Sequence, residues 1–314
     1  MEKACIICRE LKNESDFNDE HVIPDSLGGY YHTYKVCKAC NSELGHKVDS
    51  RLVNNFLSQV CRERLEIKGK SGNIPRPLTG TFTLSDDPTQ KVKVKYEAGK
   101  LQPILITKVE DTPTGYKLSV DETHLNEAYA IIEKKNKKLG KLGKAVRTEL
   151  KSQERTFPLL TNSFTIDFNG LQMGLLKIAY EFTIDEIPSY YEDETAIQIS
   201  KILKTNDLTF PNIEFLTPVL LDKTQPALLE NFIDIKDACK HYLFLYQFKN
   251  DALYCCVNLF DTYFLIIKMS EKMYLKPYEF ILGINEIKNR TYKRYKGDEL
   301  ILAISEAGKK GLKL

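Results

Sequence analysis

The chain has 314 residues, of which 42% are hydrophobic and 28% are charged, and its formal net charge is +2. This balance is typical of a folded protein of about two domains and excludes a largely disordered chain. No stretch approaches the roughly 18 apolar residues of a membrane span, and the N-terminal sequence MEKACIICRE has no apolar core of the signal-peptide type. We therefore expect a cytoplasmic protein that has no membrane partner.

Two CxxC pairs lie near the N-terminus, and together they contain half of the eight cysteines: Cys5, Cys8, Cys37 and Cys40. In a reducing compartment, two such pairs are the usual way to hold Zn²⁺ with four thiolates. The metal would stabilise a unit of about 60 residues that is too small to fold around an apolar core alone. The spacing therefore predicts a structural zinc site.

A helix is expected after the second CxxC pair because apolar residues recur at every fourth position from Leu44 to Val60. Residues 68–77, KGKSGNIPRP, have the composition of a linker. Strands are predicted beyond the linker where β-branched residues alternate with polar ones: 79–86, 91–99, 103–111 and 116–121. A further helix is predicted to begin after Asp121.

Positive charge is concentrated in the middle of the chain. Residues 61–151 hold 19 basic and 12 acidic side chains, whereas residues 1–60 have a net charge of −2 and residues 152–314 a net charge of −3. The candidate nucleic-acid-binding residues are Lys134, Lys135, Lys137, Lys138, Lys141 and Lys144. Such a run can bind the phosphates of a polyanion, and a solvated helix face is the alternative. Gly140 and Gly143 predict that the helix gives way to a basic loop here.

The second half of the sequence predicts a mixture of helices and antiparallel strands. Residues 163–168 are predicted to form a strand, Asn169-Gly170 a turn, and residues 171–182 and 189–204 helices. Three strand-like runs, 241–248, 252–260 and 262–270, predict an antiparallel meander. We therefore expect an α+β protein with domains at 1–67, 78–151 and 152–314, or with residues 78–314 as one domain.

The residues that carry chemistry lie between and just after the CxxC pairs. The insert contains Glu20-His21, and Asn41 directly follows Cys40, so the zinc would hold an acid–histidine pair near an asparagine. Oxygen ligands suit a hard cation such as Mg²⁺, and a neutral imidazole can deprotonate water. This set of residues predicts metal-assisted hydrolysis.

The motifs EHVIPDSLGG and VCKACN, placed between and over the two CxxC pairs, resemble those of the HNH endonucleases of the ββα-metal type. The resemblance covers about residues 4–52 and is greatest to a bacterial zinc-binding subgroup whose motif ends CxxCN-x3-G-x3-D. It implies a small zinc-stabilised ββα-metal nuclease module in which His21 is the general base. It also implies that Glu20, for which Asp19 is the alternative, and Asn41 bind one Mg²⁺ or Mn²⁺, and that the products carry a 5′-phosphate and a 3′-hydroxyl.

The sequence departs from the family at the middle asparagine, which normally orients the base. Residues 30–34 contain no asparagine, so His32, Thr33 or a backbone carbonyl is the candidate to orient His21. Asp49 is a candidate second partner of the site or a contact that anchors the helix. Asn41 could instead cap a helix that starts after the zinc site.

The leading hypothesis is a metal-dependent endonuclease that cuts double-stranded DNA. The basic segment would hold the duplex, and the C-terminal region would recognise the target or regulate cleavage. Restriction or phage defence is the expected setting, with a homo-oligomer or an activating protein or ligand as the expected control. The alternative is a non-catalytic zinc-ribbon module that binds nucleic acid or protein, and an enzyme that acts on RNA is a third reading that no RNA-binding motif supports.

Overall fold

The structure of the protein is a computed structural model that describes residues 2–113, 115–141, 148–149, 151–152, 159–208, 213–215, 236–248, 251–276 and 279–313. The chain is α+β and divides into two compact units. The core unit joins Met1–Pro75 to Ile166–Leu314, and the inserted unit is Arg76–Thr165. The boundary at Pro75 falls within the linker predicted at 68–77, but the two ends of the chain share one unit instead of forming serial domains.

The N-terminal part of the core unit consists of short elements. The strands are β1 (Glu2–Ala4), β2 (Leu11–Asn13), β3 (Glu20–His21) and β4 (His32–Thr33), with 3₁₀ turns η1 (Glu14–Asp16) and η2 (Asp25–Leu27). Helix α1 (Lys38–Leu44) continues through a π-helical turn η3 (Gly45–Asp49) into α2 (Ser50–Val53), and α3 (Phe56–Arg64) follows. The predicted helix is therefore present but interrupted, because Asn55 accepts a hydrogen bond from Leu57 N and starts α3.

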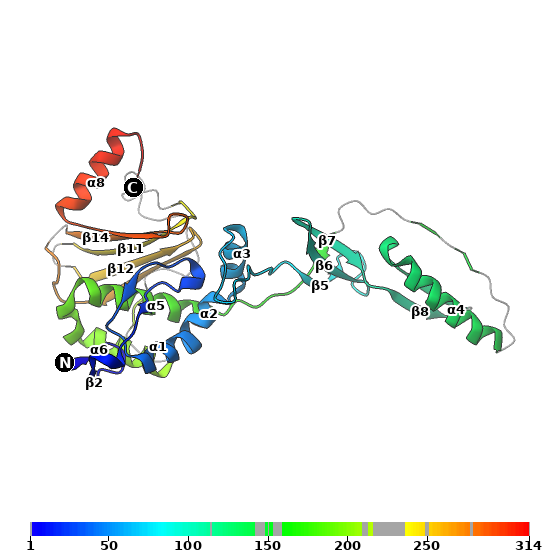
Figure 1. Ribbon diagram of the computed structural model, residues 1–314, viewed down its shortest axis with the longest axis horizontal. Coiled ribbons are helices and arrows are strands. Elements are labelled where there is room, and N and C mark those ends of the chain that lie inside the picture. Colours follow the sequence, from blue (N-terminus) through cyan, green and yellow to red (C-terminus); the bar gives the residue numbers. More distant parts are fainter. Residues whose placement is uncertain are drawn as a thin grey trace. The chain divides into compact units, whose positions relative to one another are not determined.

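The C-terminal part of the core unit is a five-stranded antiparallel sheet with helices on both faces. The strands are ordered β13-β12-β11-β14-β15, and their bounds are β11 (Lys240–Gln247), β12 (Leu253–Leu259), β13 (Tyr263–Ser270), β14 (Phe280–Glu286) and β15 (Thr291–Lys296). Strands β11, β12 and β13 confirm the predicted meander. Helix α5 (Phe168–Glu186) packs on one face, and α8 (Asp298–Lys309) on the other (Figure 1).

Helix α5 is the centre of the core unit. Every residue from Met173 to Ile184 is buried, and most of them are apolar. The 3₁₀ helix η5 (Pro188–Glu192) and helix α6 (Glu194–Thr205) follow it. One continuous apolar core contains Leu52 of α2, Leu176 of α5 and Val257 of β12. The N-terminal motifs and the C-terminal sheet therefore fold around the same helix.

The predicted strand at 163–168 and the turn at Asn169-Gly170 are wrong. Both Asn169 and Gly170 lie in the first turn of α5, whose N-cap is Asp167. Its carboxylate accepts a hydrogen bond from Gly170 N at 2.9 Å. The helix includes this turn-favouring dipeptide because the carboxylate of Asp167 caps the helix two residues before Asn169.

The inserted unit has a small core formed by Leu84, Val92 and Val94. Its sheet is ordered β10-β5-β6-β7, with a separate β8–β9 hairpin. The elements are β5 (Gly80–Leu84), β6 (Lys91–Glu97), β7 (Lys100–Leu105), β8 (Lys108–Thr112), β9 (Gly115–Ser119), η4 (Glu122–His124), α4 (Leu125–Lys141) and β10 (Leu160–Thr161). The stretch predicted as one strand at 103–111 is thus divided between β7 and β8.

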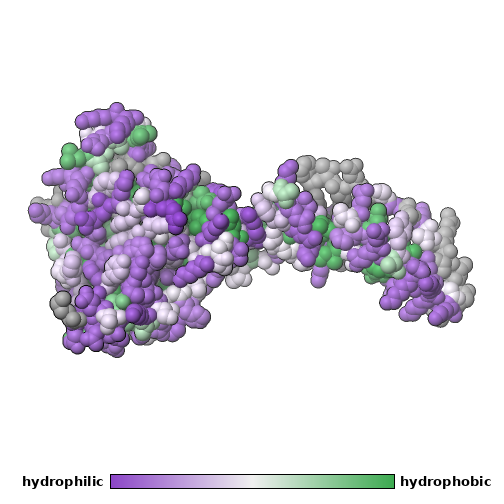
Figure 2. Space-filling model, viewed as in Figure 1, coloured by the Kyte–Doolittle hydropathy of each residue, from purple (hydrophilic) through white to green (hydrophobic). Residues whose placement is uncertain are grey.

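Helix α4 includes Gly140 and extends to Lys141, the last described residue before the predicted basic loop. Gly143 and Arg147 of the basic run lie outside the described residues. Figure 2 shows that the visible surface is mainly hydrophilic. Within the described ranges, no helix is both long and apolar enough to cross a membrane.

Candidate functional site

The four cysteines of the CxxC pairs lie together, as their spacing predicts. Their sulfur atoms are all within 4.8 Å of one another, and each cysteine is free. Cys5 and Cys8 lie between β1 and β2, and Cys37 and Cys40 lie at the start of α1. The backbone N–H of Cys37 donates to the Sγ of Cys5 at 3.3 Å. Four thiolate donors this close together fit a tetrahedral Zn²⁺ site.

The thiols influence one another strongly. A hydrogen bond from Cys40 lowers the pKa of Cys5 to about 4, whereas burial raises the pKa of Cys8 to about 11. The hydrogen bond with Cys5 and burial also raise the pKa of Cys40. Since ionisation of one sulfur opposes ionisation of the next, a cation is needed to hold all four as thiolates. Lys204 of α6 adds a positive charge 4.0 Å from the Sγ of Cys40.

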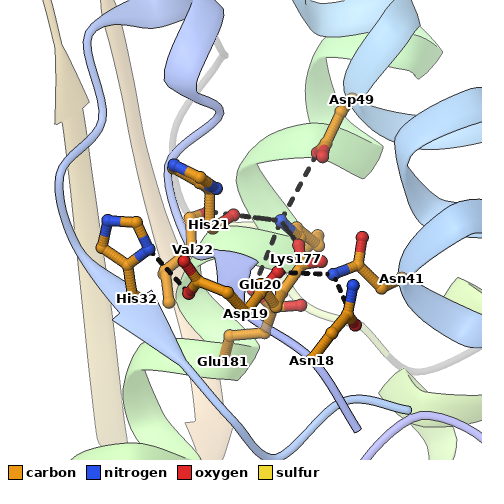
Figure 3. A network of polar contacts seen from close by, with 10 residues as sticks. All are labelled: Asn18, Asp19, Glu20, His21, Val22, His32, Asn41, Asp49, Lys177 and Glu181. Carbon is orange, nitrogen blue, oxygen red and sulfur yellow. Dashed lines mark hydrogen bonds and ion pairs between the residues drawn. The ribbon is translucent and has the colours of Figure 1, made fainter. Parts of the chain in front are cut away.

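Strands β3 and β4 form a two-residue hairpin that carries the acid–histidine pair. Glu20 is paired with Thr33, and His21 with His32. Glu20 faces the interior and is 2% exposed, while His21 and His32 project on the other side (Figure 3). The rings of the two histidines are 4.2 Å apart between centroids. The Nδ1 of His32 lies 2.7 Å from Oδ1 of Asp19.

The surroundings of His21 keep its imidazole neutral. Burial, followed by the neighbouring His32, lowers the pKa of His21 below its usual value of 6.5. A neutral ring at pH 7 is the form that a general base needs. Of the side chains predicted to orient it, His32 contacts the ring, whereas the Oγ1 of Thr33 donates to Asp185 of α5 at 2.9 Å.

Asn41 lies in the first turn of α1, beside the strand that carries His21. The N-cap of this helix is Cys37, which accepts a hydrogen bond from Asn41 N, so the capping alternative for Asn41 is wrong. The Nδ2 of Asn41 donates to the backbone oxygen of Asp19 at 2.9 Å and to Oδ1 of Asn18 at 3.2 Å. These acceptors fix the amide so that its Oδ1 points away from them (Figure 3).

A buried ion cluster lies on the inner side of β3. Its centre is Lys177 of α5, whose side chain is 0% exposed. The Nζ of Lys177 is 2.5 Å from Oε1 of Glu20. It is also 3.3 Å from Glu181 and 3.5 Å from Asp49, and it donates to the backbone oxygen of His21 at 2.7 Å. Asp49 is therefore linked to Glu20 and to the backbone of His21 by its ion pair with Lys177.

The cluster shares one cation among several carboxylates. Burial would lower the pKa of Lys177, but Asp49, Glu181 and Glu20 outweigh burial and raise it. Burial raises the pKa of Asp49 to about 6 and that of Glu181 well above its usual range. The lysine is thus held in its charged form.

Sequence reasoning missed Lys177 and its neighbour Glu181. Their one signal is a lysine and a glutamate four residues apart inside the mostly apolar run LQMGLLKIAYEF. Such a pair on a helix is common on surfaces. Its burial could only be recognised once α5 was known to be enclosed on all sides.

Residues 5–57 match a family model described as HNH endonuclease. The match spans both CxxC pairs, the β3–β4 hairpin and α1. This segment, about one sixth of the chain, is similar to the HNH endonucleases. No curated protein matches the chain, and no solved structure matches it. We refer to residues 5–57 below as the HNH domain.

Two groups of side chains in the HNH domain offer donor atoms that suit a cation. Glu20 and Asn41 offer oxygen donors, which suit Mg²⁺ or Mn²⁺. Asp19, His21 and His32 offer donor atoms within 4.8 Å of one another, and this mixture suits an imidazole-preferring transition metal. A cation on the second group would occupy a nitrogen of His21. The assignment of His21 as the base therefore favours the first group.

Two of the predicted nucleic-acid-binding lysines are engaged within the inserted unit. Lys135 of α4 forms an ion pair with Asp111 at 2.6 Å. Lys137 forms an ion pair with Glu133, one turn earlier on the same helix, also at 2.6 Å. These internal pairs reduce the charge that the two lysines offer to a phosphate.

The other described lysines of the run lie on one side of α4. Lys134, Lys138 and Lys141 are exposed and follow the spacing i, i+4, i+7, which places them in one stripe along the helix. None of the three has a carboxylate partner within the described part of the chain. We call these three residues the lysine stripe. Lys144 lies outside the described residues.

Proposed function

We propose that the protein is a metal-dependent endonuclease that hydrolyses the phosphodiester bonds of double-stranded DNA. The observation that carries this proposal is the arrangement around β3 in the HNH domain. A neutral, half-buried imidazole, His21, projects on one side of the strand. An acidic ligand candidate, Glu20, lies on the other side, and Asn41 holds the strand from α1.

In this mechanism His21 is the general base. It accepts a proton from the water that attacks the phosphorus atom. The bond from phosphorus to the 3′-oxygen breaks, and this oxygen takes a proton from solvent, so that the new ends carry a 5′-phosphate and a 3′-hydroxyl. Glu20 and Asn41 would hold one Mg²⁺ or Mn²⁺, which when bound supplies positive charge for the scissile phosphate and the leaving oxygen. Asn41 contributes its Oδ1, because its Nδ2 is already engaged with Asp19 and Asn18.

The cysteine cluster is proposed to bind Zn²⁺ in a structural role. Four thiolates fill a tetrahedral coordination sphere and leave no position for water or phosphate. The zinc would hold the loop before β2 against the start of α1, which carries Asn41. It therefore supports the site without taking part in the chemistry.

The proposed DNA contact outside the HNH domain is the lysine stripe. Residues 1–60 have a net charge of −2, and four thiolates with one Zn²⁺ would add about −2 more. Binding of a polyanion then needs positive charge from elsewhere in the chain. Residues 61–151, with 19 basic and 12 acidic side chains, carry that charge.

A cytoplasmic location, a role in restriction or phage defence, and control by self-association or an activator stay predictions. The non-catalytic zinc-ribbon module is the alternative. It accounts for the four cysteines but assigns no task to the neutral imidazole of His21 or to the buried carboxylate of Glu20. We therefore favour catalysis.

The proposal is tested by the nicking of supercoiled plasmid in Mg²⁺ or Mn²⁺, with zinc content measured for each protein. The wild-type chain should cut, and His21→Ala should cut at least about 100-fold more slowly, because general-base catalysis contributes roughly that much. His46→Ala is the matched control, since His46 is an exposed histidine of the same domain. Cleavage by zinc-loaded His21→Ala at the wild-type rate would overturn the role of His21. A zinc-loaded wild type that binds DNA without cutting would favour the zinc-ribbon alternative.

A further inference from the structure

The strand that carries both candidate catalytic groups is weakly supported by its own sheet. Strands β3 and β4 are each two residues long, and an isolated hairpin is marginally stable at best. Beyond them, the N–H of Val22 donates to Tyr31 at 3.0 Å, so this residue bonds on the β4 side. By the alternation of a strand, the carbonyls of Asp19 and His21 lie on the opposite edge. Something other than β4 must fix that edge.

Two side chains bind the free edge of β3. The Nδ2 of Asn41 donates to the oxygen of Asp19 at 2.9 Å, and the Nζ of Lys177 donates to the oxygen of His21 at 2.7 Å. Only Lys177 also contacts a side chain of the strand, the carboxylate of Glu20 at 2.5 Å. One ammonium group therefore fixes the backbone of the base and the carboxylate next to it (Figure 3).

Stability of the core does not by itself account for a lysine at this position. The side chain is fully buried, and removing an ammonium and its carboxylates from water costs several kcal/mol per ion. Buried ion clusters can often be replaced by apolar residues without loss of stability. The neighbours of Lys177 along α5, such as Leu176 and Ile178, are apolar and fully buried. A buried methionine would suit α5 equally well. We therefore attribute the charge of Lys177 to the groups that it contacts, the carboxylate of Glu20 and the backbone of His21.

We propose that Lys177 is a positioning residue of the nuclease site, an inference that rests on the function proposed above. Its ammonium group orients the carboxylate of Glu20 toward the cation and fixes the main chain from which the His21 imidazole projects. Lys177 lies on α5, well outside residues 5–57 that match the family. The C-terminal part of the chain thus completes the site of the HNH domain.

The test compares two variants of the full-length, zinc-loaded chain. Lys177→Met/Glu181→Gln removes the ammonium together with one of the buried carboxyl groups that it contacts, so that fewer buried acids are left without their cation. Glu181→Gln alone is the matched control, because Glu181 contacts Lys177 at 3.3 Å and no bond from it to β3 is found among the described residues. The measured quantities are the Kd for Mn²⁺, by electron paramagnetic resonance without DNA, and then kcat and the Kd for DNA.

Residues that orient metal ligands typically change metal affinity or activity 10–100-fold. We therefore expect the double variant to bind Mn²⁺ at least about 10-fold more weakly than Glu181→Gln and to lose a similar factor in kcat. The Kd for DNA should stay within about two-fold, because Lys177 is buried away from any nucleic acid. If the double variant lacks zinc, Lys177→Gln/Glu181→Gln replaces it, since its amide keeps one donor for the His21 carbonyl.

Equal Mn²⁺ affinity and kcat in the double variant and in Glu181→Gln would overturn the inference and leave the proposed function intact. Tighter Mn²⁺ binding in the double variant would also overturn it, because the ammonium would then compete with the cation for Glu20. A wild-type chain that neither binds Mn²⁺ nor cuts DNA would instead overturn the proposed function, and the positioning role with it.

Discussion

Neighbouring groups shift the pKa of His21 in opposite directions. Burial and the adjacent His32 lower its pKa, whereas the carboxylates of Asp25, Asp19 and Glu20 raise it. The net direction is downward, so that the ring is mainly neutral at pH 7. A general base works best when its pKa is not far below the working pH. The three carboxylates limit how far burial can depress it.

The rate of cleavage should therefore fall as the pH drops through the pKa of His21, below the usual value of 6.5, and be level above it. In His32→Ala, the loss of a neighbouring imidazole that lowers the pKa of His21 should move this acid limb to higher pH. The dependence of kcat for plasmid nicking on pH, between about pH 5 and 8, locates the acid limb in the wild type and in the variant. A uniform loss of rate without a shift of the limb would contradict the electrostatic role of His32.

At the scale of elements, the loop between β3 and β4 is held by the C-terminal sheet. Asn285 of β14 donates to the oxygen of Gly28 at 2.8 Å and accepts from Tyr30 N at 2.7 Å. The Nε2 of His241 on β11 donates to the oxygen of Leu27 at 2.9 Å. Both side chains are buried. The turn of the HNH motif therefore takes its shape from strands that lie more than 200 residues away in the sequence.

Gly29 is required in this loop because its backbone lies against another backbone. A Cβ at Gly29 would lie 1.9 Å from the oxygen of Ile23, so Gly29→Ala should lower the free energy of unfolding by about 3 kcal/mol or more. Gly45→Ala is the matched control, since no atom lies within 4 Å of its added Cβ and its φ of −57° is helical. That change should raise the free energy by roughly 0.5–1 kcal/mol. Urea unfolding of both variants measures the difference, and equal stabilities would contradict the close approach.

His241 makes the attachment of the loop to β11 sensitive to pH. Burial lowers the pKa of His241 to about 4 from its usual value of 6.5, and its Nδ1 has no hydrogen-bond partner among the described residues. Because the unfolded chain takes up the proton first, this contribution to stability is complete above pH 6.5 and is lost as the pH falls toward 4. Between pH 7.5 and 5.0 the loss amounts to about 2 kcal/mol.

His241→Gln should remove this loss, because glutamine can still donate to the oxygen of Leu27 but does not titrate. The measurement is the free energy of unfolding in urea at pH 7.5 and 5.0, for the variant and the wild type. His46→Gln, at an exposed position of the same unit, should keep the pH dependence of the wild type. An identical pH dependence in His241→Gln would mean that His241 titrates normally in the folded chain.

At the scale of the molecule, the features predicted from the sequence are those that depend on residues close together in the chain. The cysteine cluster, the acid–histidine pair and the β11–β13 meander follow from local patterns. Contacts between distant segments could not be predicted, because they depend on how the chain packs. Lys177 and Asn285 reach the HNH domain from segments that carry no motif. Local signals also failed where a helix cap outweighed them, as at Asn169-Gly170, which lies in the first turn of α5.

The role proposed for the inserted unit, DNA binding, rests on its charge alone. If the lysine stripe binds DNA phosphates, replacing Lys134, Lys138 and Lys141 with glutamine should weaken binding and flatten its salt dependence. Each lost phosphate contact reduces the slope of log K against log salt by about 0.9, so the triple variant should lose up to about 3. The measurement is the Kd for a DNA duplex from about 50 to 200 mM salt.

The matched control is Lys135→Gln/Lys137→Gln, which removes charge from the same helix. Because these lysines are paired with Asp111 and Glu133, each should release fewer counterions on binding, and the slope should change by less than one third of the loss in the triple variant. A slope that falls in proportion to the number of lysines removed would indicate a diffuse field around α4 in place of a defined stripe. An unchanged slope in the triple variant would exclude this helix from the DNA contact, and the duplex would then have to be bound by the core unit.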